Sequence, residues 1–299
     1  MNHKEFGHLI AALRKEHFDE EGNRLTQAHL AERARQIDHL TPLNEVILGK
    51  IERGERANLD AQTLLSLADT LRLTIGERRE FFLAATGLQD EQIYVTQENP
   101  QAILASVLCT LREIQLPALL VDRYLDVIAV NSSALKMYNI NQMNLYNRQE
   151  QPAGFNLLSY IFSADFEPQR SLMTQQEWHR FAAGNVIYFR RVTLHYRMTD
   201  YFAGLLAQLR RSREFRWHWE QVFDEEKLYF VGGESFQMGN SGSGRFYYLT
   251  APLVTLTPYG NLEIITHIPR NGETAATFQQ MAATEDSLVY QLSSWPEKP

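Results

Sequence analysis

The sequence lacks the features of a membrane-spanning or disulfide-stabilised protein. Its 299 residues include one cysteine, Cys109, so no disulfide can form within the chain. No apolar run approaches the roughly 20 residues that a membrane-spanning helix needs. The N-terminus shows neither an uninterrupted apolar segment nor a small-residue cleavage site. We therefore expect a cytoplasmic protein, with Cys109 buried inside the apolar stretch LASVLCTL.

Common signatures of catalysis are also missing. The sequence has no GxxxxGK[ST] phosphate loop, no HExxH zinc motif and no GxSxG nucleophile motif. Its nine histidines show no ligand spacing with cysteine. The glycine-rich loop at 239–244 is a poor phosphate cradle because no helical pattern follows it. We expect no enzyme activity, no metal and no cofactor.

Positive charge is scarce. The net charge is −7, and residues 1–90 carry twelve Lys and Arg against fifteen Asp and Glu. Proteins that bind DNA are often basic, because the phosphate backbone dominates their affinity. Nucleic-acid binding by this chain would therefore need a local basic face.

Aromatic residues are unevenly distributed. Residues 1–119 contain five and residues 120–299 contain the other 28. The first part is rich in Leu, Ala, Glu and Arg, which favour helices, whereas the second mixes helical and β-prone segments. A polar stretch at 88–101 separates them. The predicted domains are a helical domain over 1–88, a linker with a helix over 89–116, an α+β domain over 117–269 and a C-terminal extension over 270–299.

Residues 1–88 carry the pattern of five short helices. In the first helix, four apolar residues share one face: Phe6, Leu9, Ile10 and Leu13. Thr26 and Asp60 suit the N-caps of the second and fourth helices. Gly54 suits the end of the third helix. Thr74 and Glu77 have the spacing of a capping box that opens the fifth.

These helices resemble the Xre/lambda-repressor class of helix-turn-helix domains. The segments that carry the resemblance are LTQAHLAERA (25–34), ILGKIERGER (47–56) and LLSLADTLRL (64–73). The resemblance implies that the third helix lies in the major groove of duplex DNA, with Gln27 against a phosphate. By position, we expect Asn44, Glu45 and Leu48 to reach base edges. Lys50, Arg53 and Arg56 are expected to bind phosphates.

Two points about this domain stay open. The class usually has a short glycine-containing turn after its second helix, whereas residues 35–41 are longer and lack glycine. Thr41-Pro42 and Asn44 are therefore rival starts of the third helix. The alternative function is a protein-interaction or scaffold module that binds no DNA and has a PAS-like second domain without a ligand. In that module the basic residues form an ordinary solvated face between Glu45, Glu52 and Glu55.

The second part opens with a helix and two strands. Residues 101–115 predict a helix with Ile103, Val107, Leu111 and Ile114 inward, which suits a linker or a dimer contact. The segments ALLV and DVIAV predict strands around a turn at 122–124, and Asn131 or Ser132 can cap the helix that follows. Further strands are predicted at 234–238, 245–257 and 261–268. Pro252 indicates an edge strand or a bulge. This arrangement looks like a PAS domain.

A helical insertion separates the two groups of strands. Its longest helix is predicted from Gln175 to about Arg197, with one aromatic face. That face suits either plain core or the wall of an apolar cavity. The residues predicted to bind an apolar ligand such as a fatty acid are Trp178, Phe181, Phe189 and Tyr196. Arg190 and Arg191 are candidates for holding its carboxylate.

Residues 5–268 resemble the MmyB-like regulators, in which an Xre-type helix-turn-helix is joined to a PAS-like ligand-binding domain. The added segments are LLVDRYLDVIAVN (119–131), NLLSYIF (156–162) and SREFRWHWEQ (212–221). The resemblance implies a transcription regulator that binds duplex DNA and a small organic molecule, and it leaves the ligand open. We expect a homodimer, because one small helix-turn-helix buries little surface on DNA.

Overall fold

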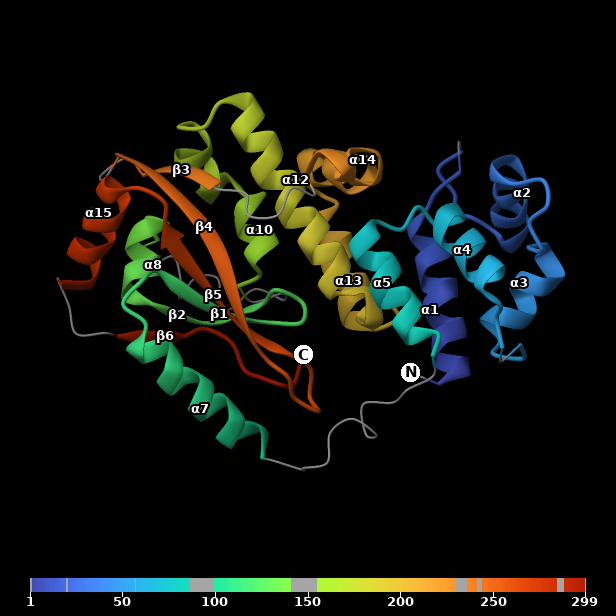
Figure 1. Ribbon diagram of the computed structural model, residues 1–299, viewed down its shortest axis with the longest axis horizontal. Helices are drawn as coiled ribbons and strands as arrows, with labels where there is room; N and C mark the ends of the chain where they lie inside the picture. The colour runs from blue at the N-terminus through green and yellow to red at the C-terminus, as the bar shows by residue number, and fades with distance from the viewer. Residues whose placement is uncertain are drawn as a thin grey trace. The chain divides into compact units, whose positions relative to one another are not determined.

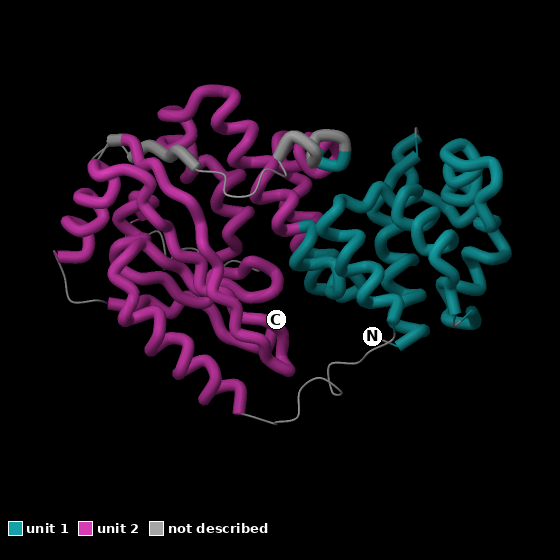
Figure 2. The backbone as a smooth tube through the Cα atoms, in the orientation of Figure 1, with its two compact units in different colours: residues 1–95, 190–204, 222–226 teal, residues 96–189, 205–221, 227–299 magenta. Residues whose placement is uncertain are grey.

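The computed structural model describes residues 2–19, 21–56, 58–86, 99–140, 155–229, 236–240, 244–283 and 288–298. The chain divides into two compact units (Figure 2). The first takes in residues 1–95, 190–204 and 222–226, and the second takes in residues 96–189, 205–221 and 227–299. The domain boundary predicted at 88 and 89 lies outside the described residues.

The first unit contains the five predicted helices (Figure 1). They are α1 (His3–Glu16), α2 (Gln27–Ile37), α3 (Glu45–Glu52), α4 (Ala61–Thr70) and α5 (Ile75–Ala84). The predicted caps Thr26 and Asp60 accept hydrogen bonds from backbone amides of α2 and α4, and the capping box of Thr74 and Glu77 opens α5. Asn44 caps α3, so the third helix starts at the second of the two rival positions.

The core of this unit brings α1 into direct contact with α3. The predicted apolar face of α1 is buried, together with Leu48 and Ile51 of α3. A Cβ atom on Gly7 would lie 2.4 Å from the backbone oxygen of Ile51, so the two backbones touch and only glycine fits at position 7. Gly54 follows α3 with a φ of 71°, as predicted for a helix end.

A buried ion pair lies beneath α3. Arg14 donates from Nε to Glu52 Oε1 at 2.7 Å and from Nη2 to Glu52 Oε2 at 2.9 Å. Arg14 also donates to the carbonyl of Leu25. Gln27 donates its amide to Glu52 Oε2 at 2.7 Å. The first residue of α2 is thus joined to the last residue of α3 through the paired carboxylate.

The second unit is built on an antiparallel sheet with strand order β3-β4-β5-β1-β2-β6. The strands are β1 (Ala118–Asp122), β2 (Val127–Asn131), β3 (Phe236–Asn240), β4 (Gly244–Thr255), β5 (Leu262–Pro269) and β6 (Val289–Gln291). The predicted α+β class is confirmed. Residues 270–299, which the sequence sets apart as an extension, supply α15 (Gly272–Ala283) and the edge strand β6.

Helices cover both faces of the sheet. On one face, α7 (Pro100–Glu113) packs against Ala118, Leu120 and Ile128. Cys109 is exposed, so its predicted burial is wrong. The buried side of α7 consists of Ile103, Leu104, Val107 and Leu111, and position 109 falls on the opposite side of the helix.

Most of the remaining helices come between β2 and β3 in the chain. They are α8 (Ser132–Met137), α10 (Leu157–Ile161), α11 (Glu167–Arg170), α12 (Gln175–Val192), α13 (Asp200–Leu209) and α14 (Arg213–Tyr229), with the short 3-10 turns η1 (Ala164–Phe166) and η2 (Leu194–Tyr196). The helix predicted to reach Arg197 ends at Val192, and η2 follows it. Asn131 caps α8, the first of the two caps left open by the sequence.

Pro252 lies where β4 has one neighbour. Strand β3 pairs with residues 244–248 of β4, whereas β5 pairs with 248–255. Along the second half of β4, no other described strand lies on the side away from β5. Since proline cannot donate to a strand ladder, this edge position is the one that the sequence predicts for it.

Candidate DNA-contacting helix and ligand pocket

Helix α3 presents a polar, exposed side. Asn44, Glu45 and Lys50 are exposed, as is the C-cap residue Arg53. Leu48, predicted to reach base edges, is instead fully buried in the core. Val46, an apolar residue of the same helix, is 67% exposed. Positions 48, 51 and 52 are spaced to share one side of α3, which is buried, and position 46 turns outward.

The polar residues around α3 differ in how firmly they are held. Gln27, predicted to touch phosphate, is half-buried and bonded to Glu52. Arg53 forms two hydrogen bonds with Glu55, at 2.7 and 3.0 Å, and this contact lowers the pKa of Glu55. Arg56 follows the turn and is half-buried. The local basic face that DNA binding requires is therefore small and partly offset by acidic neighbours.

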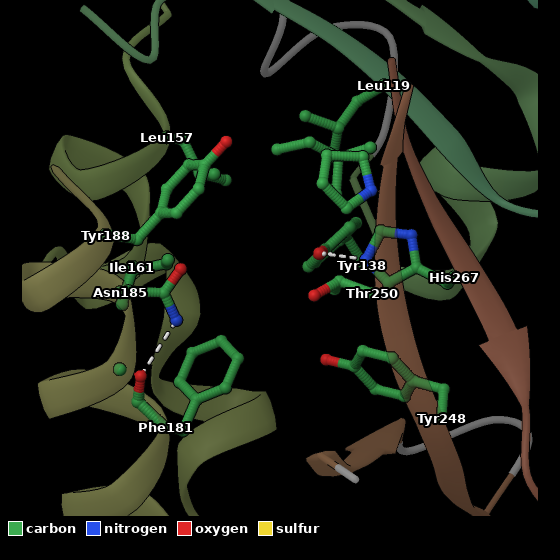
Figure 3. A pocket seen from close by; sticks show the side chains of 13 residues that line it. Leu119, Tyr138, Leu157, Ile161, Phe181, Asn185, Tyr188, Tyr248, Thr250 and His267 are labelled. Atoms are coloured by element: carbon green, nitrogen blue, oxygen red, sulfur yellow. Dashed lines mark hydrogen bonds between the residues drawn. The ribbon is translucent and has the colours of Figure 1, made fainter. Parts of the chain in front are cut away.

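A cavity of about 190 Å³ lies in the second unit, between the sheet and the helices (Figure 3). Its lining comes from β1, β4, β5, the end of α8, α10 and α12: Leu119, Tyr138, Leu157, Ile161, Phe181, Gly184, Asn185, Tyr188, Tyr248, Thr250, Pro252, Ile265 and His267. In Figure 3, Tyr188, Asn185 and Phe181 face the cavity from α12, and His267, Thr250 and Tyr248 face it from the sheet. Such a mainly apolar lining with a few polar groups is typical of small-molecule sites.

The polar groups of the pocket form a fixed network. The ring of His267 lies 2.9 Å from the carbonyl of Pro117 through Nδ1 and 2.7 Å from the Tyr138 hydroxyl through Nε2. A carbonyl can only accept, so Nδ1 carries the proton and Nε2 accepts from Tyr138. Burial lowers the pKa of His267 to about 4, so the ring is neutral near pH 7. The Tyr138 oxygen can still accept a bond from a ligand.

A carboxyl group with an unusual pKa lies next to the pocket. The hydroxyl of Tyr188 donates to Glu263 on β5. Burial raises the pKa of Glu263 from 4.5 to about 7. The neutral form of this carboxyl is therefore well populated near physiological pH, although most glutamates are ionised there.

Glu263 predicts how the stability of the second unit depends on pH. The folded chain binds this proton more tightly than the unfolded chain does, so the contribution of Glu263 to the free energy of unfolding is largest below pH 4.5 and falls as the pH rises to about 7. The loss should be roughly 1–3 kcal/mol, and Glu263→Gln should abolish it. Urea unfolding followed by tryptophan fluorescence measures this, with the exposed Glu273→Gln as the control. The same loss in both variants would exclude Glu263 as its source.

The residues predicted to bind the ligand are not all at this cavity. Phe181 lines it. Trp178 lines a separate open hollow and packs on Phe166, and Phe189 packs on Trp219. Arg190 pairs with Glu77 in the first unit, the exposed Arg191 lies beside Gly76, and Tyr196 belongs to η2. The structure thus keeps one of the six residues at the pocket and places the two arginines elsewhere.

The lining of the cavity also includes residues that the periodicity of a single helix cannot predict. Tyr138, Tyr248 and His267 come from α8, β4 and β5, far apart in the sequence. No arginine or lysine is among the described lining residues. The pocket is therefore suited to an uncharged or weakly charged group rather than to a carboxylate held by a strong cation.

Comparison with known families finds a match for part of the chain that lines the pocket. Residues 104–228 match the MmyB-like transcription regulator ligand binding domain. The predicted resemblance is confirmed for this part of the chain, which contains the pocket residues of β1, α10 and α12. The match does not extend to residues 1–88, so the resemblance to Xre-type helix-turn-helix domains stays a prediction. A search of curated proteins finds no match.

The family that residues 104–228 match is described as a ligand-binding domain of transcription regulators. Within the described residues, no group of three or more His, Cys, Asp and Glu side chains is placed to hold a metal ion. The described helices also include none that is long and apolar enough to cross a membrane.

Proposed function

We propose that the protein is a transcription regulator that binds duplex DNA through α2 and α3 and is controlled by an apolar small molecule in the second unit. The observation that carries this proposal is the 190 Å³ cavity, because eight of its thirteen lining residues lie in the segment that matches a ligand-binding domain. The five-helix unit with a capped, exposed α3 supports the DNA-binding half. On this proposal the chain acts in the cytoplasm as a homodimer and catalyses no reaction.

The ligand we propose is a molecule with an aliphatic chain, such as a fatty acid. A cavity of roughly 150 Å³ holds a benzene-sized molecule, so 190 Å³ suits a chain of medium length. A smaller cavity of about 20 Å³ shares Leu119, Tyr138 and Leu157 with the pocket. A longer aliphatic chain would have to displace these side chains to enter the smaller cavity.

Chain length and head group both test the ligand class. Each added methylene should strengthen binding about fourfold, from roughly 0.8 kcal/mol per buried group, until the cavity is full. Octanol should bind at least as tightly as octanoic acid, because the acid is largely ionised near pH 7 and the pocket offers tyrosine hydroxyls and the Asn185 amide rather than a cation. Isothermal titration of the full chain measures both series. If neither octanoic acid nor octanol binds, the proposed ligand class is wrong.

The DNA-binding half predicts a steep dependence on salt. Each phosphate contact contributes roughly 0.9 to the slope of log K against log salt. The triple substitution of Lys50, Arg53 and Arg56 by alanine should flatten the slope by up to about 3 per subunit. The assay is fluorescence anisotropy with a duplex that the full-length chain enriches from a random pool.

A charge-matched control separates this face from net charge. Lys15, Arg79 and Arg112 are exposed cations on α1, α5 and α7. Their replacement by alanine should leave the slope nearly unchanged. Equal slopes for the wild type and the α3 variant would place DNA binding elsewhere, and no enrichment of any duplex would favour the interaction-module alternative.

A further inference from the structure

A segment from within the matched ligand-binding domain completes the first unit. Residues 190–204 lie inside the match over 104–228, but by packing they belong with α1–α5. Leu194 is fully buried in the same apolar core as Phe81 of α5. The predicted DNA-binding unit is therefore not made of N-terminal residues alone.

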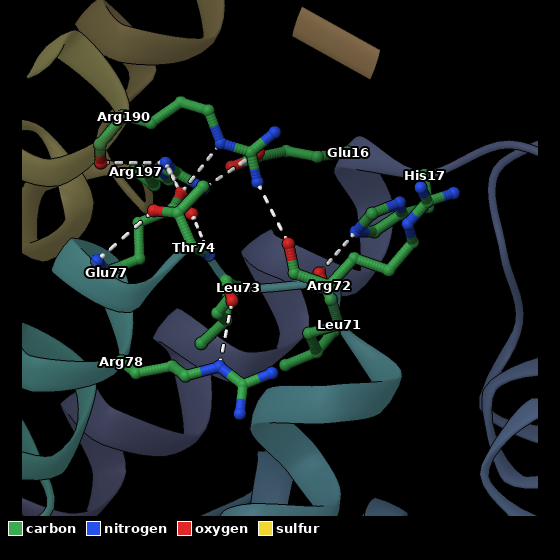
Figure 4. Close-up of polar contacts among 10 residues, drawn as sticks. All are labelled: Glu16, His17, Leu71, Arg72, Leu73, Thr74, Glu77, Arg78, Arg190 and Arg197. Carbon is green, nitrogen blue, oxygen red and sulfur yellow. Dashed lines mark hydrogen bonds and ion pairs between the residues drawn. The ribbon is translucent and has the colours of Figure 1, made fainter. Parts of the chain in front are cut away.

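This segment, which we call the docking segment (190–204), is anchored by buried charges (Figure 4). Arg190 donates from Nε to Glu77 Oε1 at 3.0 Å, and Arg197 donates to the same oxygen. Arg197 also donates to Glu16 Oε2 at 3.1 Å and to the carbonyl of Arg190 at 2.8 Å. Arg190 reaches the carbonyl of Arg72 at 3.3 Å.

Each buried charge in this network is stabilised by a neighbouring charge of opposite sign. Glu77 is 0% exposed and both arginines are nearly as buried. Burial alone would raise the pKa of Glu77, but Arg190 and Arg197 lower it to about 2, so the carboxylate is ionised above pH 5. Removing one partner would leave a buried charge uncompensated, which is far more costly than losing a surface pair.

Helix α12 joins this anchor to the pocket. Phe181, Asn185 and Tyr188 line the cavity, and Arg190 follows Tyr188 by two positions in the same helix. At 1.5 Å per residue, Tyr188 and Arg190 are separated by about 3 Å along the helix axis. A displacement of α12 that accommodates a ligand would therefore also move Arg190.

The anchor in turn reaches the helix proposed to contact DNA. Glu16, a partner of Arg197, is the last residue of α1. Helix α1 touches α3 where Gly7 meets the backbone oxygen of Ile51. A shift of the docking segment would therefore move α1, and α1 would move α3 because the two helices are in backbone contact.

We propose that the docking segment transmits the state of the pocket to the first unit, with Glu77, Arg190 and Arg197 as its anchor. This inference rests on the proposed function, because it supposes that the pocket binds a ligand and that the first unit binds DNA. A ligand shifts the arrangement only by its difference in affinity between two states. The ion network is the physical contact through which that difference in affinity acts on the first unit.

Hydrogen exchange of the full-length chain tests the transmission without DNA. The readout is amide exchange in peptides covering α1 and α5. The pocket is perturbed in two ways, by octanoic acid and by Thr250→Trp, which places a large ring in the cavity. Arg190→Met removes the anchor, and Arg191→Met is the matched control at the neighbouring, exposed position.

In the wild type and in Arg191→Met, both perturbations should change exchange in α1 and α5 by about tenfold, as expected for a changed local opening. In Arg190→Met, the response should shrink to within about twofold while the second unit responds as before. If Arg190→Met unfolds the first unit, Arg190→Lys replaces it, because lysine keeps the charge but cannot make both contacts.

Two outcomes would overturn the inference: an unchanged response in the Arg190 variant, or no response of α1 and α5 in the wild type. A failure of octanoic acid to bind would count against the proposed ligand alone. Thr250→Trp still reports on transmission in that case, since it needs no ligand.

Discussion

Glu52→Gln should destabilise the first unit by about 3–5 kcal/mol, because it leaves Arg14 buried without its counter-charge. Arg14 makes two hydrogen bonds to this carboxylate, and Gln27 shares it. For a domain of this size, the melting temperature should fall by at least about 10 °C. Circular dichroism at 222 nm measures this, since the unit is helical.

The control and the second probe follow from the structure. Glu55→Gln removes an exposed partner of Arg53 and should leave the melting temperature of the first unit nearly unchanged. All four tryptophans belong to the second unit, so tryptophan fluorescence should shift less than circular dichroism. Equal melting temperatures for the two glutamine variants would show that the buried pair contributes no more than a surface pair.

Thr250→Trp should weaken the binding of octanoic acid by about a hundredfold, because the indole ring would occupy most of a 190 Å³ cavity. Thr250 lines the pocket from β4 while itself being exposed, so the fold should tolerate the larger side chain. Isothermal titration measures the loss of affinity, and thermal unfolding checks that the variant is folded.

Leu253→Trp is the matched control on the same strand. Leu253 is 53% exposed and is not among the lining residues. Because neighbouring positions on a strand alternate between faces, Leu253 lies on the face opposite Thr250. The Leu253→Trp variant should bind octanoic acid as the wild type does. Equal losses in both variants would mean that the acid binds somewhere other than this cavity.

The sequence predicts the helices of the first unit well because their signals are local. Thr26, Asp60 and the pair Thr74 and Glu77 each act within three residues of a helix start. The prediction that Leu48 reaches base edges is wrong. Leu48 and Ile51 are three positions apart, so they share one side of the helix, and both are buried in the core of the first unit.

The pocket could be predicted only in part. Helical periodicity identifies Phe181, since one helix carries the pattern. Tyr138 and His267 are 129 residues apart, and only the pairing of β1 with β5 brings them together. The sequence does not predict the ion pairs of Glu77, because the capping box at the start of α5 already accounts for a glutamate at this position. Its partner Arg190, at a separation of 113 residues, therefore looked like a free cation for a ligand.

The most direct test of ligand control is the affinity of the full-length chain for its enriched duplex, with and without saturating octanoic acid. The proposal predicts that the acid changes the Kd for DNA by about 5- to 100-fold, the range expected for coupled sites. The change should be absent in Thr250→Trp and present in Leu253→Trp. A wild-type chain that binds the acid but shows the same Kd for DNA in its presence would contradict the account.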